Sequence, residues 1–147
     1  MSAAQQEPYA LARACAHTMY ANDAASQSLG MRILDVAPGR ARVAMLVRED
    51  MVNGHRTCHG GFIFSLADSA FAFACNTYDA VTVAAGASIE FLAPARLGDE
   101  LTAIAEEQAR SRRTGVYDVA VVNQGGERIA LFRGRSHQLD GRVLERG

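Results

Sequence analysis

A chain of 147 residues, 49% hydrophobic and 21% charged, is long enough to bury one core and too short for two, so we expect a single domain spanning 1–147. The net charge of −1 supplies no basic field that would attract nucleic acid, which excludes a nucleic-acid partner from our expectations. The three cysteines form no C-x-x-C pair, and the N-terminal segment lacks the basic and apolar regions of a secretory signal. We therefore predict a cytoplasmic protein with reduced thiols.

The beginning of the chain predicts a helical extension over 1–29. Pro8 suits the first position of a helix, and apolar residues then recur at helical spacing as far as Ala21. Asp23 can cap a second short turn, and Gly30 suits the left-handed conformation that closes helices. We expect strands to begin directly after this glycine.

The remaining sequence, apart from one long helix, predicts strands. They cover residues 31–37, 40–47, 82–92, 100–109, 115–123 and 127–139. Pro38-Gly39 joins the first two as a hairpin, and the polar residues 48–58 form a loop. The strand over 115–123 is apolar on both faces, which is typical of a central strand. Residues 141–147 are expected to form a frayed, flexible tail.

Residues 59–78, HGGFIFSLADSAFAFACNTY, predict the long helix around which the chain is organised. Apolar side chains point in every direction around its 3.6-residue period, so we expect it to be buried. Polar residues interrupt the run and argue against a membrane span. A sheet of about six strands that curls around this helix would bury it on most sides, which is an α+β fold.

Asp68 lies within this helix without a Lys, Arg or His three or four residues away. A buried carboxylate without a partner is costly and calls for a reason. In an apolar cleft such a group can act as a general base toward water or attack directly as a nucleophile. The structural alternative is a buried Asp that is hydrogen-bonded to the backbone or to a Ser or Thr hydroxyl.

The start of the helix, His59-Gly60-Gly61, offers backbone N–H groups without intrahelical partners at the positive end of the helix dipole. A carbonyl oxygen placed there would be polarised, which suggests acyl chemistry, although for the glycines alone a tight turn or close packing is the favoured explanation. Gly60 and Asp68 are separated by about 12 Å along the helix, so one carbonyl cannot touch both. If both serve one reaction, the active site is shared between two subunits, with two sites per dimer.

The segment from Asn53 to Asn76, NGHRTCHGGFIFSLADSAFAFACN, resembles the signature of the hotdog-fold thioesterases of the phenylacetic-acid-degradation (PaaI) type. The resemblance continues through FLAPARLGD, RRTGVYD and LFRGRSH in the predicted strands, and it leaves out the first thirty or so residues and the tail. It implies a hotdog fold, an acyl-CoA substrate carrying a phenylacetyl or hydroxyphenylacetyl group, no cofactor, and homodimers often paired into a homotetramer.

The resemblance also implies roles for particular residues. Asp68, Gly60 and Asn53 would be catalytic, with Asn53 holding the attacking water or the thioester, although an ordinary Asn-Gly turn is the alternative for this residue. Ser88 is the candidate for a hydroxyl that relatives often place near the acid. The substrate-binding candidates are His59, Gly61, Ser88, Arg112, Arg113 and Arg133. The arginines could bind the phosphates of coenzyme A through their planar fork, or simply form a solvated face.

Other chemistries fit the sequence less well. His55, Cys58 and His59 lie close together but lack a further ligand pair, so we expect no metal site, and no acid is evident to orient Cys58 and His59 as a nucleophilic pair. Our leading interpretation is acyl-CoA hydrolysis. The alternatives are a non-catalytic acyl-CoA binding or sensor module, which the retained acid disfavours, and a hydratase, for which the chain lacks the His-plus-acid pair at the spacing that those relatives use.

Overall fold

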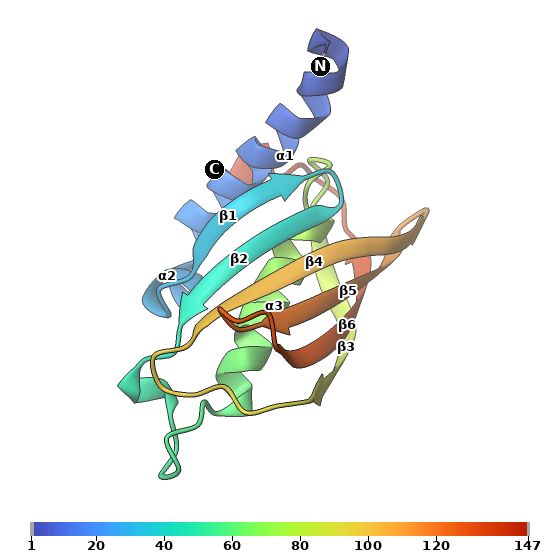
Figure 1. Ribbon diagram of the computed structural model, residues 1–147. Coiled ribbons are helices and arrows are strands. Elements are labelled where there is room, and N and C mark those ends of the chain that lie inside the picture. The colour runs from blue at the N-terminus through green and yellow to red at the C-terminus, as the bar shows by residue number, and fades with distance from the viewer. Residues whose placement is uncertain (1, 147) are drawn as a thin grey trace.

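Residues 2–146, which this computed structural model describes, form one antiparallel sheet of six strands that curves around a long helix, α3 (Gly60–Cys75) (Figure 1). The strands are β1 (Arg32–Ala37), β2 (Arg40–Leu46), β3 (Thr82–Phe91), β4 (Glu100–Ser111), β5 (Thr114–Val122) and β6 (Arg128–Gln138). Their order across the sheet is β1-β2-β4-β5-β6-β3, so β1 and β3 form its edges. The predicted α+β fold, with a sheet of about six strands around the helix, is confirmed.

All six predicted strands are present, each within one or two residues of its expected ends. The turn residues explain this agreement: Gly39, for example, has φ of 71° in the Pro38-Gly39 turn between β1 and β2. The central position of β5, between β4 and β6, is also confirmed. Its two faces are covered unequally, because Tyr117 and Val119 are buried beneath α3 whereas alternate residues on the other face are only half-buried.

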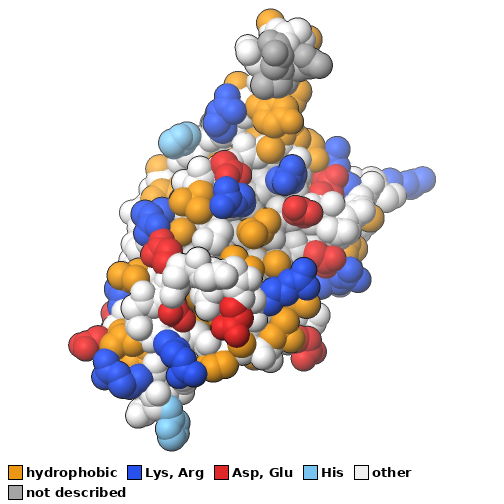
Figure 2. Space-filling view, in the orientation of Figure 1, with side chains coloured by type: hydrophobic (Ala, Val, Ile, Leu, Met, Phe, Trp, Pro, Cys, Tyr) orange, Lys and Arg blue, Asp and Glu red, His pale blue; other side chains and the backbone are white. Residues whose placement is uncertain are grey.

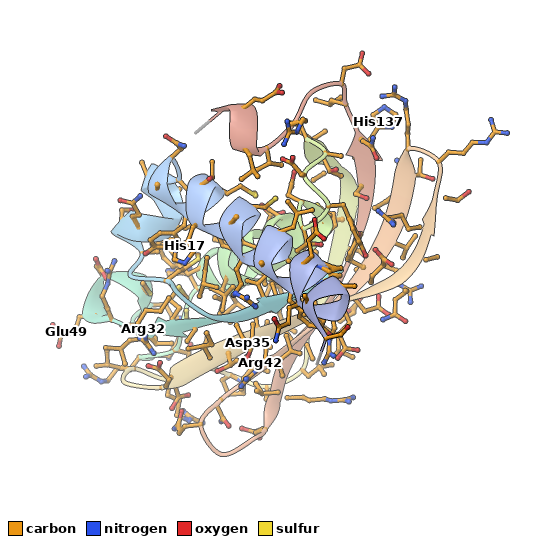
Figure 3. All side chains as sticks on the ribbon, turned by 90° about the horizontal axis from the view of Figure 1, so that it is seen from above. His17, Arg32, Asp35, Arg42, Glu49 and His137 are labelled. Atoms are coloured by element: carbon orange, nitrogen blue, oxygen red, sulfur yellow. The ribbon has the colours of Figure 1, made fainter. Side chains whose placement is uncertain are left out.

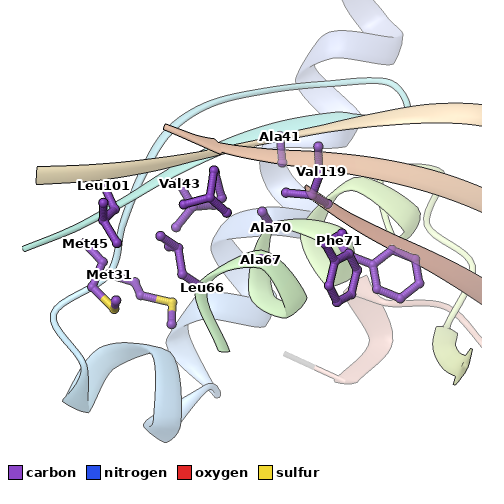
Figure 4. Close-up of a cluster of buried hydrophobic side chains, with 14 of the residues drawn as sticks. Met31, Ala41, Val43, Met45, Leu66, Ala67, Ala70, Phe71, Leu101 and Val119 are labelled. Atoms are coloured by element: carbon purple, nitrogen blue, oxygen red, sulfur yellow. The ribbon is translucent and has the colours of Figure 1, made fainter. Parts of the chain in front are cut away.

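The core lies between the concave face of the sheet and α3. Figure 4 shows Leu66 and Phe71 of the helix against Val43 of β2 and Val119 of β5, all of them buried. Phe71 packs directly onto Gly134 of β6, where an added Cβ would lie 2.7 Å from the ring. This glycine therefore lets α3 pack closely on the sheet. It thereby sets the distance between the sheet and the side chains of the helix.

The side of α3 that faces away from the sheet is open. Its residues recur at intervals of three or four and are small or polar: Gly61, Ser65, Asp68 and Ala72. Gly61 is exposed, and the other three are half-buried. The expectation that this helix is buried all round is wrong for the single chain, because this stripe has little apolar area that could drive its burial.

The N-terminal extension forms α1 (Ala3–Ala21) and α2 (Ala24–Ser28), and α1 lies along β1 (Figure 1). Pro8 lies inside α1 and does not open it, which corrects the prediction. The missing proline N–H leaves only the carbonyl of Ala4 without its helical partner, and this carbonyl lies in an exposed first turn where water can bind it. Asp23 caps α2 as predicted, accepting a hydrogen bond from the Ser26 N–H.

The C-terminal segment, expected to fray, is anchored over 142–144. Asp79 accepts hydrogen bonds from the Leu144 N–H at 2.9 Å and from Arg142 Nε at 2.7 Å. Val143 is buried against Cys15 of α1, and a short 3-10 helix, η2 (Leu144–Arg146), follows. The last residue, 147, lies outside the described part of the chain.

Charges of both signs are interspersed on the face shown in Figure 2, which fits the net charge of −1. Figure 3 shows one such pair from above, in which Arg42 of β2 contacts Asp35 of β1 with an N–O distance of 2.7 Å. None of the helices in residues 2–146 is long and apolar enough to cross a membrane.

Candidate active site

The N-terminus of α3 presents free backbone donors. His59 occupies the N-cap position, yet its side chain makes no capping hydrogen bond. Within residues 2–146, neither the Gly60 N–H nor the Gly61 N–H has an acceptor. Such donors at the positive end of a helix favour a carbonyl oxygen or an anion, so this end of α3 can stabilise negative charge on a bound group.

The two glycines at this helix end have different surroundings. A Cβ added to Gly60 would lie 2.8 Å from the ring of Phe91, the last residue of β3, so close packing does explain the glycine at this position. A Cβ added to Gly61 would have nothing within 4 Å. The space beside Gly61 is therefore open to a ligand. No local pattern in the sequence indicated Phe91, whose half-exposed ring borders the predicted site.

Asp68 is half-buried on the open face of α3, one turn beyond Ser65. Its carboxylate makes no hydrogen bond or ion pair with any described residue, so the structural alternative of a hydrogen-bonded buried Asp is not realised. Burial raises the pKa of Asp68, and the negative charge of Asp23 raises it further. A carboxylate with a raised pKa is a stronger base than an ordinary one, which suits proton abstraction from water.

Asp23 reaches the neighbourhood of Asp68 through a chain of hydroxyl groups. Its carboxylate accepts hydrogen bonds from the Ser26 N–H at 2.9 Å and the Ser26 hydroxyl at 2.6 Å. The Ser26 hydroxyl lies 2.8 Å from the hydroxyl of Ser69, the residue that follows Asp68. The sequence identified Asp23 as a cap, but its effect on Asp68 depends on how α2 packs against α3 and could not be predicted.

Asn53 is committed in part to its own loop. Its side-chain oxygen accepts hydrogen bonds from the His55 N–H, the Thr57 N–H and the Thr57 hydroxyl, at 2.9, 3.2 and 3.1 Å. The turn-forming role that the sequence offered as an alternative is therefore present. The Asn53 amide nitrogen has no acceptor among residues 2–146, so it remains able to donate to a ligand.

Four of the predicted binding residues lie away from Gly60. Arg112 and Arg113 form the β4–β5 turn, beside a small cavity that Cys75 at the last turn of α3 also lines. That end of α3 is about 22 Å from Gly60. Ser88 of β3 pairs with Arg133 of β6 on the outer face of the sheet, opposite α3. One chain therefore does not bring these residues to Gly60 or Asp68.

The predicted arginines differ in what they already bind. Arg113 donates to Asp140 at 2.9 Å, and Arg133 donates to both carboxylate oxygens of Asp118 at 2.6 and 2.9 Å. The Arg112 side chain contacts no acidic group in the described chain. Among the three, Arg112 is the guanidinium that could take a phosphate without giving up an ion pair.

The single cysteine of the loop before α3 and its neighbouring histidines do not form a reactive centre. Cys58 is buried, and burial raises the pKa of its thiol to about 11, so the thiolate that nucleophilic catalysis requires is disfavoured. Within residues 2–146, no group of three His, Cys, Asp or Glu side chains is arranged to hold a metal ion. Asp68 and the N-terminus of α3 are the reactive features that remain.

Comparison with known proteins identifies the class to which this fold and site belong. Residues 55–130 match the sequence model of the Thioesterase superfamily. The chain belongs to this family and is a thioesterase of the hotdog fold. The resemblance seen in the sequence is thereby confirmed.

Individual members of the family are similar to this chain over most of its length. The acyl-coenzyme A thioesterase PaaI of Escherichia coli is 48% identical over 128 residues, which cover 87% of this chain and 91% of that protein. The solved structure of the E. coli PaaI protein from the phenylacetic acid degradation operon gives a TM-score of 0.90 at 47% identity, covering 91% of this chain and 97% of that one. A Streptococcus mutans protein solved with bound acetyl-CoA gives 0.73 at 26% identity, covering 76% and 90%.

Proposed function

We propose that this protein hydrolyses acyl-CoA thioesters, in particular phenylacetyl-CoA or hydroxyphenylacetyl-CoA. The observation that best supports this proposal concerns α3. On surfaces that the single chain leaves open, this helix presents an uncapped N-terminus and the unpaired carboxylate of Asp68, whose pKa is raised. Two relatives support the substrate class, since one is named as an acyl-CoA thioesterase and another was solved with acetyl-CoA bound. The three free, buried cysteines fit a cytoplasmic location.

In the proposed mechanism the thioester carbonyl oxygen accepts a hydrogen bond from the Gly60 N–H. Asp68 takes a proton from water as the water oxygen bonds to the carbonyl carbon, and the resulting oxyanion is held at the helix N-terminus. Collapse of this intermediate breaks the carbon–sulfur bond, and the proton on Asp68 passes to the sulfur of coenzyme A. A donor to the oxyanion contributes about 3 kcal/mol to such a reaction. Direct attack by Asp68, followed by hydrolysis of the anhydride, is the second route that the residues permit.

The active site in this proposal is shared between two subunits. Gly60 and Asp68 are about 12 Å apart on one straight helix, too far for both to reach one carbonyl. The open face of α3 and the neighbouring edge strand β3, whose residues are mostly exposed, supply a surface for a second copy. A two-fold pair would place the Gly60 end of one helix near Asp68 of the other, giving two sites per dimer, and such dimers would pair into a tetramer.

The remaining candidates take supporting roles. The free amide of Asn53 would donate to the attacking water or to the thioester. Arg112 would bind a phosphate of coenzyme A across a subunit boundary, whereas Arg113 and Arg133 would have to exchange a carboxylate partner for the phosphate. His59 and Gly61 would border the thioester at the helix end. Ser88 faces the outer surface, so it would reach an active site only through contacts between subunits.

The reaction is tested with a panel of phenylacetyl-, short-chain and long-chain CoA esters in an assay that traps free thiol. Asp68→Ala and Asp68→Asn should lower kcat by several orders of magnitude with the fold intact, as judged by circular dichroism. Asp35→Asn, an exposed acid on β1, serves as the matched control. Near-normal turnover by the Asp68 variants would refute the assignment. Tight binding of the esters by the wild type without thiol release would identify a non-catalytic acyl-CoA module.

Shared sites are tested by mixing subunits. Gly60→Pro removes the N–H and also places a Cβ against the Phe91 ring, so it disables this end of the helix. His59, with φ of −57° and ψ of 137°, already has a conformation that is allowed before proline. A purified heterodimer of an Asp68→Ala subunit and a Gly60→Pro subunit keeps one intact site if sites are shared. We expect about half of the wild-type activity from two nearly inactive parents. An inactive heterodimer would place the whole site within one chain.

A further inference from the structure

A hollow of about 560 Å³ lies between the end of α1, α2, the end of α3 and the C-terminal segment. Residues that line it come from α1, from α2, from the end of α3 and from the C-terminal segment: Met19, Asp23, Ala25, Asn76, Val81 and Val143. Its volume is within the range of small-molecule binding sites. None of these residues belongs to the mechanism proposed above.

One wall of the hollow, at Asp23, lies near Asp68, which is not itself among the lining residues. Asp68 and Ala72 lie on the open face of α3, whereas Asn76, which follows the last residue of the helix about 12 Å farther along, lines the hollow. At the other wall, Asp23 is held to Ser69 through Ser26. Asp23 is close enough to raise the pKa of Asp68. The hollow therefore lies toward the C-terminal end of α3 from the proposed reacting carboxylate, and its Asp23 wall is the side that approaches Asp68.

Most polar side chains in the lining have partners within the described chain, the hydroxyl of Thr18 being the exception. Asn76 donates to the Thr82 carbonyl and accepts from the Thr82 N–H, both at 2.9 Å, and Asn22 donates to the Thr18 carbonyl at 3.0 Å. Asp23 is hydrogen-bonded to Ser26. The other lining side chains are mostly apolar, so the hollow offers a ligand apolar contact and few free hydrogen-bonding groups.

The charge in the hollow further restricts the chemical groups that could bind there. Its one ionised lining side chain is that of Asp23, which would repel a phosphate of coenzyme A or a free carboxylate. An uncharged, apolar group attached to a reacting carbonyl fits both the chemistry and the position. The group that meets this description in a thioester substrate is its acyl chain.

We propose that α1 and α2 form the outer wall of the acyl-binding pocket, and that Ala25 and its neighbours in this hollow select the acyl group. This inference rests on the proposed thioester hydrolysis, and it assigns a role to a segment that precedes the residues matched by the family model. Small residues at positions 24 and 25 leave room for an aryl group, and the large Met19 limits its depth.

The test fills the hollow. Ala25→Phe places a ring within it, whereas Ala21→Phe places the same ring on the exposed end of α1, outside the lining. We expect Ala25→Phe to lower kcat/KM for phenylacetyl-CoA about tenfold or more relative to acetyl-CoA, because lost apolar contacts discriminate acyl groups by this order. Ala21→Phe should leave the ratio unchanged. An unchanged ratio in Ala25→Phe would overturn the proposal.

A binding measurement separates this proposal from the hydrolysis itself. The non-hydrolysable thioether analogue of phenylacetyl-CoA should bind more tightly than coenzyme A in titration calorimetry, and Ala25→Phe should remove most of that difference. This result would support the pocket even if no ester were hydrolysed. A wild type that binds the analogue no more tightly than coenzyme A would refute it. Dissociation of the oligomer by Ala25→Phe in sedimentation would show that a second copy fills the hollow and would also refute it.

Discussion

Gly134→Ala is expected to destabilise the fold at the point where α3 seats on the sheet. The new Cβ would lie 2.7 to 2.8 Å from three atoms of the Phe71 ring. That ring is 1% exposed and is held by the rings of Tyr117 and Phe132, with centroids at 5.6 and 5.8 Å, so it has no free space into which to move. Overpacking of this kind costs about 1–3 kcal/mol, against a gain of about 0.4–1 kcal/mol from the stiffer unfolded chain.

The net expectation is a loss of about 1–2 kcal/mol in the free energy of unfolding, or roughly 2–8 °C in Tm. Urea and thermal unfolding followed by circular dichroism, at one protein concentration, would measure it. Gly61→Ala is the control, because its Cβ would meet nothing within 4 Å and should not destabilise. The cost should shrink when Phe71→Leu is present, giving a coupling energy of about 1 kcal/mol. A Gly134→Ala protein as stable as the wild type would refute this account of how α3 is positioned.

Three further predictions concern acids. Asp23→Asn keeps the cap of α2 but removes a like charge, so the pKa of Asp68 should fall and the acidic limb of the pH–activity profile should move to lower pH. Asp68→Asn should raise Tm at neutral pH, because the raised pKa means that the ionised acid opposes folding above its unfolded pKa; the gain should disappear in acid. Asp79→Asn should speed amide exchange at Leu144 several-fold, because it weakens the Arg142 contact.

Each of these three predictions would be contradicted by a specific result. A limb that stays in place in Asp23→Asn would show that burial alone sets the pKa of Asp68. A lower Tm in Asp68→Asn would mean that the ionised acid stabilises the fold. For Asp79, burial acts to raise the pKa, but the hydrogen bonds from Leu144 and Arg142 outweigh it and lower the pKa. The wild-type segment should therefore loosen only as the pH falls through that lowered value, and loosening near neutral pH would contradict this.

Much of the fold followed from local signals in the sequence. Turn residues such as Gly39 and the cap Asp23 act over a few neighbours, so the strands and both N-terminal elements were predictable. Burial was harder to predict because it depends on what covers a face, and one face of α3 and one face of β5 are left uncovered in the single chain. Pro8 was misplaced because an exposed first turn tolerates the loss of one hydrogen bond.

The candidate site also has some features that the sequence predicts and others that only the structure shows. Asp68 and Gly60 could be proposed from composition and spacing along one helix, and their separation follows from helix geometry alone. Phe91 against Gly60 and Asp23 near Asp68 are contacts between distant segments, which no local pattern carries. The arginines were chosen by charge, and only the structure shows that Arg113 and Arg133 already hold carboxylates.

The anchoring of residues 142–144 has a thermodynamic consequence. Val143 covers the fully buried Cys15 and also lines the hollow beside α1. An acyl group bound in the hollow and the docked C-terminal segment would therefore stabilise each other, since both would contact Val143. The rate at which a thiol reagent reaches Cys15 would report the opening of this segment, and it would fall as the hollow fills. The reactivity of Cys15, a residue far in sequence from Asp68, would therefore report how much of the hollow is occupied by a ligand.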